Sequence, residues 1–179
     1  MSEKPSYLEV LNAIAVGEER GRVLFETWAK TTRDAELAQT LAIVTIREGE
    51  HAAVFRKRLC ELGYDVREKP AADFELRLQK LRSGISDAAK FESVFGYGGA
   101  RRDEGLGTIF EDTTIDPITG ALLGRFIAEE RDTQRLLQAA YDRVKVTSID
   151  DAGLAQISQR LERLTKTIEE LKALRQRRY

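Results

Sequence analysis

Hydrophobic residues recur every three or four positions along four long stretches of this 179-residue chain. This spacing places them on one side of a helix, so it predicts helices at about residues 6–30, 34–62, 117–144 and 148–174. An apolar stripe along one face is typical of helices that pack around a shared core. The pattern therefore predicts an all-α protein with its helices arranged as a bundle.

Residues that favour helix ends support these boundaries. They are Ser6 with Glu9 and Ser148 with Asp151 as capping boxes, Thr32 as an N-cap, Asp116 followed by Pro117 as a helix start, and Gly63 as a helix end. Only residues 31–33 separate the first two stretches. A connection this short predicts that the first two helices form an antiparallel hairpin.

A connection covering residues 64–116 separates the second and third long helices. It holds two short helical patterns, which begin at Pro70 and Ser86, and a glycine-rich loop from Gly96 to Gly107. The loop lacks the spacing and the preceding strand of a phosphate-binding P-loop, so we expect it to serve only as a connection. A connection of this length can cross from one end of a bundle to the other, so the third helix need not be antiparallel to the second.

Polar residues interrupt the apolar stripes of the first two helices. Glu48 and His51, the only histidine of the chain, lie one turn apart on the same face of the second helix. Glu18 lies in line with the apolar residues of the first helix. The simplest interpretation is a core histidine that is hydrogen-bonded to a carboxylate. Burying the acid together with the histidine is costly unless a partner compensates, however, and a cation is the partner that suits this pair.

Two adjacent acids, Glu129 and Glu130, occupy the middle of the third helix. Each aligns with an apolar stripe, so either could face the core, although adjacent acids in a helix usually form a solvated face. The last helix repeats apolar residues from Leu154 to Leu174 and has no acid or histidine among them. We expect this helix to pack against the others and to contribute no ligand.

Composition and charge narrow the function classes. The chain carries 29 Lys and Arg against 30 Asp and Glu, so nothing in its net charge indicates binding to nucleic acid or to a membrane surface. A single cysteine, Cys60, excludes an internal disulfide. The N-terminal residues lack the apolar core of a signal peptide, and the chain lacks an apolar run long enough for a transmembrane helix. We therefore expect a cytoplasmic protein.

The long helices, the hairpin followed by a long connection, and the inward acids with one Glu-x-x-His pair resemble the ferritin-like superfamily, and within it the rubrerythrin-like branch. The segment REGEHAAVFRKRLCELG looks much like the second helix of that branch. The resemblance implies a single ferritin-like four-helix bundle over residues 1–179. In such a bundle, residues 64–116 would be the crossover between the second and third helices.

The resemblance also implies a set of ligands for iron, as one or two ions. Glu18 would be the first-helix ligand, Glu48 a bridging carboxylate and His51 the terminal nitrogen ligand. Glu129 or Glu130 would be the third-helix ligand. The last helix departs from the family pattern because it has no second Glu-x-x-His pair. The remaining four or five ligands are enough for one ion but fewer than a full di-iron set.

The function that this resemblance implies is metal binding with oxidase-type or peroxidase-type activity in iron or oxidative-stress handling. The alternative is a catalytically inactive ferritin-like bundle that acts as a structural or interaction protein. The sequence does not identify catalytic residues or a redox partner, so whether the chain is an enzyme stays open.

We also expect a homo-oligomer, at least a dimer. The third helix has a wider apolar face than one bundle seam needs, and exposed apolar surface of that kind usually marks an interface. The residues of this face are Leu122, Leu123, Phe126, Ile127, Leu136 and Leu137.

Overall fold

The computed structural model describes residues 7–68, 70–99 and 112–176, and these residues form helices and connections with no strand among them. The helices are α1 (Leu8–Ala29), α2 (Ala35–Glu61), α3 (Phe74–Arg82), α4 (Asp87–Phe95) and α5 (Pro117–Gln176). The predicted all-α class is therefore confirmed. The chain divides into two compact units, residues 1–141 and residues 142–179. The prediction of a single domain over the whole chain stays a prediction.

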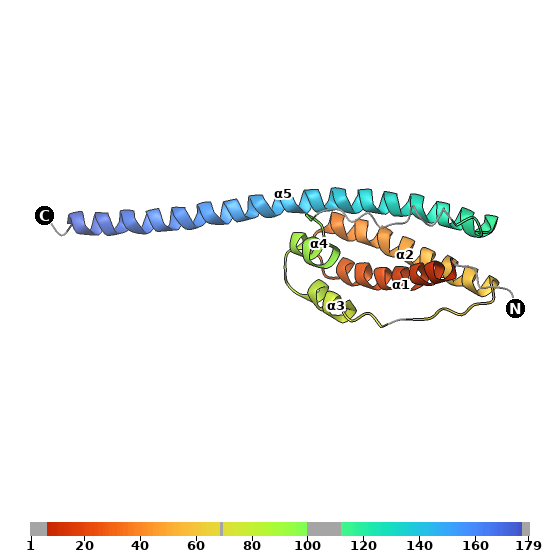
Figure 1. The fold of residues 1–179 in the computed structure, drawn as a ribbon. Helices are drawn as coiled ribbons and strands as arrows, with labels where there is room; N and C mark the ends of the chain where they lie inside the picture. Colours follow the sequence, from red (N-terminus) through yellow and green to blue (C-terminus); the bar gives the residue numbers. More distant parts are fainter. Residues whose placement is uncertain (1–6, 69, 100–111, 177–179) are drawn as a thin grey trace. The chain divides into compact units, whose positions relative to one another are not determined.

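Within the first unit, α1, α2 and the beginning of α5 lie side by side (Figure 1). The short turn after α1 makes α1 and α2 an antiparallel hairpin, as predicted. Helix α5 is antiparallel to α2, because Arg47 near the middle of α2 lies 2.7 Å from Asp132, and Arg58 near the end of α2 donates to Thr119 at the start of α5. One cluster of the core between the three helices is formed by Tyr7, Leu8, Leu11, Ile14, Ala15, Phe55, Leu59, Leu123, Phe126 and Ile127.

The connection between α2 and α5 runs past the C-terminal end of α1, which is the other end of these three helices from the start of α5. There α3 and α4 pack against the end of α1: the Trp28 indole donates to Asp87 at 2.7 Å, and the Thr31 hydroxyl donates to the Leu81 carbonyl at 2.9 Å. The Trp28 ring also packs edge-to-face on Phe91. The chain then returns, so that α5 begins beside the end of α2.

The predicted helix ends are partly correct. Gly63 follows α2 with a positive φ of 78°, as a C-terminal glycine should, and Ser86 caps α4 by accepting from the Ala89 amide. Thr32 was the wrong N-cap: the cap of α2 is Asp34, whose carboxylate accepts from the Leu37 amide. Helix α3 begins at Phe74, four residues after Pro70. Ser6, with its capping box, and much of the Gly96–Gly107 loop lie outside the described residues.

Thr32 lies in the turn between α1 and α2, where its hydroxyl makes two hydrogen bonds. Its hydroxyl donates to the Asp87 carboxylate at 2.6 Å and accepts from the Asp34 amide at 3.2 Å. The side chain therefore joins the turn to α4. Sequence spacing alone does not show this contact, because Asp87 is 55 residues away.

The start of α5 is held by Asp116, as predicted. Its carboxylate accepts from the amides of Ile118 and Thr119, both at 3.0 Å, and from the Thr119 hydroxyl at 2.6 Å. The same carboxylate pairs with the buried Arg58 at 2.8 Å and accepts from the Tyr7 hydroxyl at 3.0 Å. One side chain therefore joins the beginning of α5 to α2 and to the residue that precedes α1.

Helix α5 continues through the break that we predicted at Ser148, so the Ser148–Asp151 capping box does not start a separate helix. The physical reason is that nothing in this stretch stops a helix: no proline follows Pro117, and the single Gly153 costs only about 1 kcal/mol. In the second unit, Ile157, Leu161, Leu164 and Ile168 are 50–59% exposed. The predicted four-helix bundle with a crossover stays a prediction.

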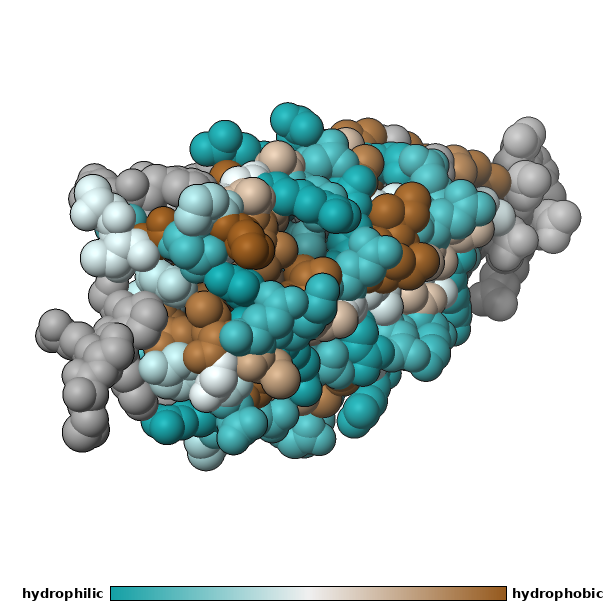
Figure 2. Space-filling model, turned by 90° about the vertical axis from the view of Figure 1, so that its right-hand side faces the viewer, coloured by the Kyte–Doolittle hydropathy of each residue, from teal (hydrophilic) through white to brown (hydrophobic). Residues whose placement is uncertain are grey.

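The apolar face of the third predicted helix is mostly used inside the chain. Leu123, Phe126, Ile127 and Leu137 are buried, so only Leu122 and Leu136 of that set remain partly exposed. Elsewhere, large apolar side chains do reach the surface, and on the side shown in Figure 2 they form patches between hydrophilic residues. Among the described helices, none is both long and apolar enough to cross a membrane.

Candidate metal centre

Three helices of the first unit bring acidic residues around His51. Helix α2 places the His51 side chain in the core, where His51 is only 3% exposed. The His51 Nδ1 atom lies 3.1 Å from Glu18 Oε2 of α1 and 3.4 Å from Glu130 Oε1 of α5. On the other side of the ring, Nε2 lies 2.8 Å from Glu129 Oε2. The structure therefore brings together four of the five predicted site residues around the imidazole.

Glu18, His51 and Glu130 form a group that could bind a metal ion. One ligand atom from each of them lies within 4.8 Å of the other two. Glu130 Oε1 is buried, and it faces His51 Nδ1 at 3.4 Å, an ion-pair contact that is longer than a well-formed hydrogen bond. A buried carboxylate oxygen without a well-formed hydrogen bond is costly, and a cation placed between these atoms would satisfy it. The residues present therefore fit a metal ion.

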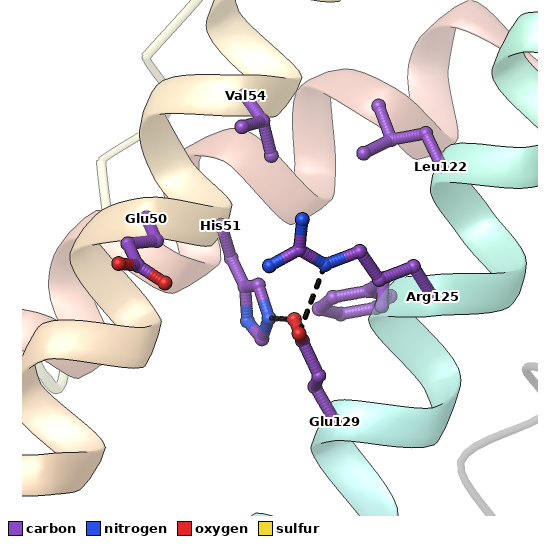
Figure 3. Close-up of a pocket in the computed structure, with 7 residues that line it drawn as sticks. Glu50, His51, Val54, Leu122, Arg125 and Glu129 are labelled. Atoms are coloured by element: carbon purple, nitrogen blue, oxygen red, sulfur yellow. Dashed lines mark hydrogen bonds and ion pairs between the residues drawn. The ribbon is translucent and has the colours of Figure 1, made fainter.

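Glu129 has a different position from Glu130, which answers the question that the sequence left open. It contacts His51 Nε2, on the ring edge that faces away from Glu18, and its other oxygen accepts from Arg125 Nε at 2.9 Å (Figure 3). Histidines that bind a metal through one ring nitrogen commonly donate through the other to a carboxylate. Glu130 thus lies in the group that could bind a metal ion, and Glu129 contacts the opposite edge of the imidazole.

Glu48 is buried beside this group but is not part of it. Its carboxyl lies against the backbone of α1 at Gly21, so closely that a Cβ atom on residue 21 would overlap Glu48 Oε2. The close approach of the two helices here depends on the missing side chain of glycine. The predicted bridging position of Glu48 between ligands is therefore not seen in the described geometry.

Burial and neighbouring charges shift the pKa values of Glu48 and His51, which both lie in the core. Burial, followed by the negative charges of Glu18 and Glu130, raises the pKa of Glu48 to about 9. Burial alone would lower the pKa of His51, but contacts with the carboxylates of Glu130, Glu18 and Glu129 outweigh it and raise that pKa to about 10. At neutral pH without a metal, Glu48 is therefore neutral and the imidazole is charged.

A small pocket reaches the outer side of the imidazole between α2 and α5. It has a volume of about 270 Å³ including its open mouth. Its lining residues are Glu50, His51, Val54, Leu122, Arg125, Phe126 and Glu129, most of which are labelled in Figure 3. The pocket gives a small molecule a route toward the Nε2 edge of the ring, past the Arg125–Glu129 pair.

Sequence reasoning missed the parts played by Gly21 and Arg125. A glycine within the buried stripe of α1 is a signal for close helix approach, although it does not show which side chain fills the space. Arg125 lies four residues before Glu129, a spacing at which such pairs meet on a helix. That spacing would have singled out Glu129 as the paired acid.

Replacing Gly21 by alanine tests whether the space that this glycine leaves for the Glu48 carboxyl affects stability and metal binding. The added methyl group would displace the Glu48 carboxyl toward the acids, so we expect no gain in stability and an Fe(II) affinity at least about tenfold weaker, comparable to the loss of an outer-shell contact. Gly17 in the same helix is the control, because a Cβ there meets nothing within 4 Å. Gly17→Ala should stabilise the helix by about 0.5–1 kcal/mol and leave metal binding unchanged. Thermal melts and metal titrations that give the same result for both variants would contradict this role.

Comparison with known proteins finds no matching family model, curated protein or solved structure.

Proposed function

We propose that this chain is a ferritin-like metal-binding protein that holds iron(II) at Glu18, His51 and Glu130. The observation that carries the proposal is the buried Glu130 Oε1, which makes no well-formed hydrogen bond and lies with Glu18 and His51 Nδ1 in a group of metal-ligand size. Two carboxylates and one imidazole are a donor set that suits iron(II), and they leave coordination positions open.

The ligand group supports one ion per chain more than two. The three ligand atoms of the group lie within 4.8 Å of one another, whereas the Glu48 carboxyl lies against Gly21 and would have to turn to join them. A bound iron(II) would supply electrons to oxygen or peroxide, which is the oxidase-type or peroxidase-type chemistry implied by the ferritin-like resemblance.

The surrounding residues would prepare the site for that chemistry. Glu129 accepts from the Nε2 side of His51 and so fixes the ring with Nδ1 toward Glu18 and Glu130. Arg125 in turn holds Glu129. Glu48, with its raised pKa, keeps a proton beside the ligand group at neutral pH. The pocket along His51 and Phe126 ends at the Nε2 edge of the imidazole, which Glu129 holds, so the proposed iron site on the Nδ1 edge lies on the packed side of the ring and is shielded from water.

The alternative is a catalytically inactive ferritin-like bundle that acts as a structural or interaction protein, and one observation favours it. A charged His51 paired with Glu18, Glu129 and Glu130, beside a neutral Glu48, satisfies much of the buried charge without any ion. In that case the acids would be a stable arrangement of hydrogen bonds and ion pairs and would not bind metal.

Melting experiments on Glu48→Leu separate the two functions. If the site binds no metal, Glu48→Leu should raise the melting temperature, because replacing a buried acid by an apolar residue is often stabilising by 1–4 kcal/mol, roughly 2–4 °C per kcal/mol at this chain length. If it binds Fe(II), the wild-type melting temperature should rise with added Fe(II). Glu50→Leu, at an exposed position of the same helix, is the control for the change in charge and size. A wild-type melting temperature indifferent to Fe(II), together with a stabilised Glu48→Leu, would contradict the metal-binding function.

A further inference from the structure

Two apolar surfaces of this chain have no partner within the described residues. The first, which we call the outer groove, runs beside the His51 pocket. Its apolar residues are Ile43, Ile46 and Val54 of α2 with Ile118 and Leu122 of α5, and the charged Glu50 and Arg125 lie among them at the pocket. Ile46 and Ile118 are 63% and 65% exposed, and Val54 and Leu122 line the pocket itself.

The second surface is the apolar seam of α5 in the second unit, from Leu154 to Leu171. The seam residues alternate at three-residue and four-residue spacing, and the four whose side chains the structure describes are half exposed or more. Helical rise makes this seam about 26 Å long, enough to cover the roughly 17 Å from Ile43 to Val54. The two surfaces are therefore compatible in length.

The residues flanking the seam disfavour pairing of two seams. Pairing of two helices as a coiled coil usually relies on charges of opposite sign at the flanking positions. Here Gly153, Ser158, Thr165 and Thr167 are uncharged, and the charged flanking residues, Arg160 and Lys172, are both basic. Two paired seams would bring only like charges together, so the seam suits a partner surface of the opposite charge.

The two units also carry opposite net charges. Residues 142–179 have nine Lys and Arg against six Asp and Glu, a net charge of +3. Residues 1–141 have 20 Lys and Arg against 24 Asp and Glu, a net charge of −4. Charge complementarity of this kind favours association of the second unit with the first and disfavours pairing of two copies of the second unit.

We propose that the outer groove binds the seam of a second copy of this chain, so that the partner's segment becomes a fourth helix packed against α2 and α5. Two copies would exchange their seams in a two-fold symmetric dimer, with both grooves filled. Folding the seam back onto the groove of the same chain would require breaking α5, which is one helix from Pro117 to Gln176. A second copy brings its seam to the groove with α5 intact.

This arrangement would close the mouth of the His51 pocket. That consequence rests on the proposed metal function, whereas the association itself rests only on the two apolar surfaces and their charges. Each can therefore fail without the other: the mass in solution reports the association, and the iron content reports the metal site.

Cross-linking with single cysteines tests the proposal directly. Two variants are made in a Cys60→Ser background, because Cys60 is exposed: Val54→Cys in the groove and Leu161→Cys in the seam. They are mixed, unfolded and refolded together, and treated with a short bismaleimide. We expect a cross-linked dimer that contains one copy of each variant, and much less product from either variant alone. A product formed mainly by Leu161→Cys alone would overturn the proposal in favour of seam-to-seam pairing.

Three further measurements complete the test. A chain carrying both cysteines that cross-links within itself at high dilution would overturn the exchange between copies. Light scattering should give about twice the 20.2 kDa chain mass for the wild type, and a monomer at micromolar concentration would overturn the proposal. Ile46→Glu in the groove and Leu164→Glu in the seam should each shift the mass toward the monomer, whereas Gln159→Glu, on the opposite side of the seam helix, should not. Retained helicity by circular dichroism shows that each variant is folded.

Discussion

Replacing His51 by alanine is expected to weaken Fe(II) binding by more than about 100-fold. Loss of an outer-shell contact already costs 10–100-fold in metal affinity, and His51 supplies a direct ligand at the centre of the group. No other histidine can replace it, because the chain has only one. The variant also leaves Glu18 and Glu130 facing each other without a nitrogen ligand between them.

Anaerobic titration with Fe(II), or with Co(II) as a coloured substitute, measures this effect. Arg125→Ala is the matched comparison: it removes the group that holds Glu129 but leaves all three ligands, so we expect a loss of about tenfold at most. Glu50→Gln, at the rim of the pocket, should bind like the wild type. Equal Fe(II) affinity for His51→Ala and the wild type would show that the imidazole is not a ligand.

Replacing Asp116 by alanine is expected to lower the free energy of unfolding by about 3 kcal/mol. The change removes the N-cap of α5 and leaves the buried Arg58 without one of its two acidic partners. Loss of a helix cap costs about 1 kcal/mol, and breaking a buried ion pair costs several more. Urea unfolding at neutral pH measures the loss. Asp112→Ala is the control, since Asp112 accepts from the Thr114 amide and hydroxyl in an exposed turn, and its loss should cost less than about 1 kcal/mol.

The Asp116 effect should depend on pH in a defined direction. Hydrogen bonds from Thr119, and then from Arg58 and Tyr7, hold the pKa of the Asp116 carboxyl well below its usual value, although partial burial opposes this. A lowered folded-state pKa means that the stabilisation is complete above the unfolded-state pKa near 4 and is lost as the pH falls below it. Wild type and Asp116→Ala should therefore converge in stability toward pH 2. A difference that stayed constant from pH 7 to pH 2 would contradict this account.

Much of the first unit could be predicted from sequence because its signals are local. The three-to-four spacing and the short turn give the α1–α2 hairpin, and Asp116 with Pro117 gives the start of α5. Glu18 and His51 lie in line with the apolar stripes of their helices, and this spacing correctly predicts that they face each other across the hairpin. Local signals are sufficient here because each helix buries one continuous stripe.

The rest depends on contacts that spacing does not contain. Thr32 and Asp34 are both good caps, and the hydrogen bond from Thr32 to Asp87 of α4 decides between them. Glu129 and Glu130 both fit a stripe, and only the position of α5 against α2 assigns one to each edge of the imidazole. The continuity of α5 through Ser148 was missed because a capping box indicates where a helix can begin and does not show that the preceding helix ends.

Iron content after anaerobic loading tests the central claim most directly. Wild-type protein is incubated with excess Fe(II), passed through a desalting column under nitrogen and analysed for metal, with His51→Ala treated in parallel. We predict about one iron per wild-type chain, little in His51→Ala, and a higher melting temperature for the loaded wild type alone. Equal and negligible iron in both proteins, with a wild-type melting temperature unchanged by Fe(II), would contradict a metal site at Glu18, His51 and Glu130.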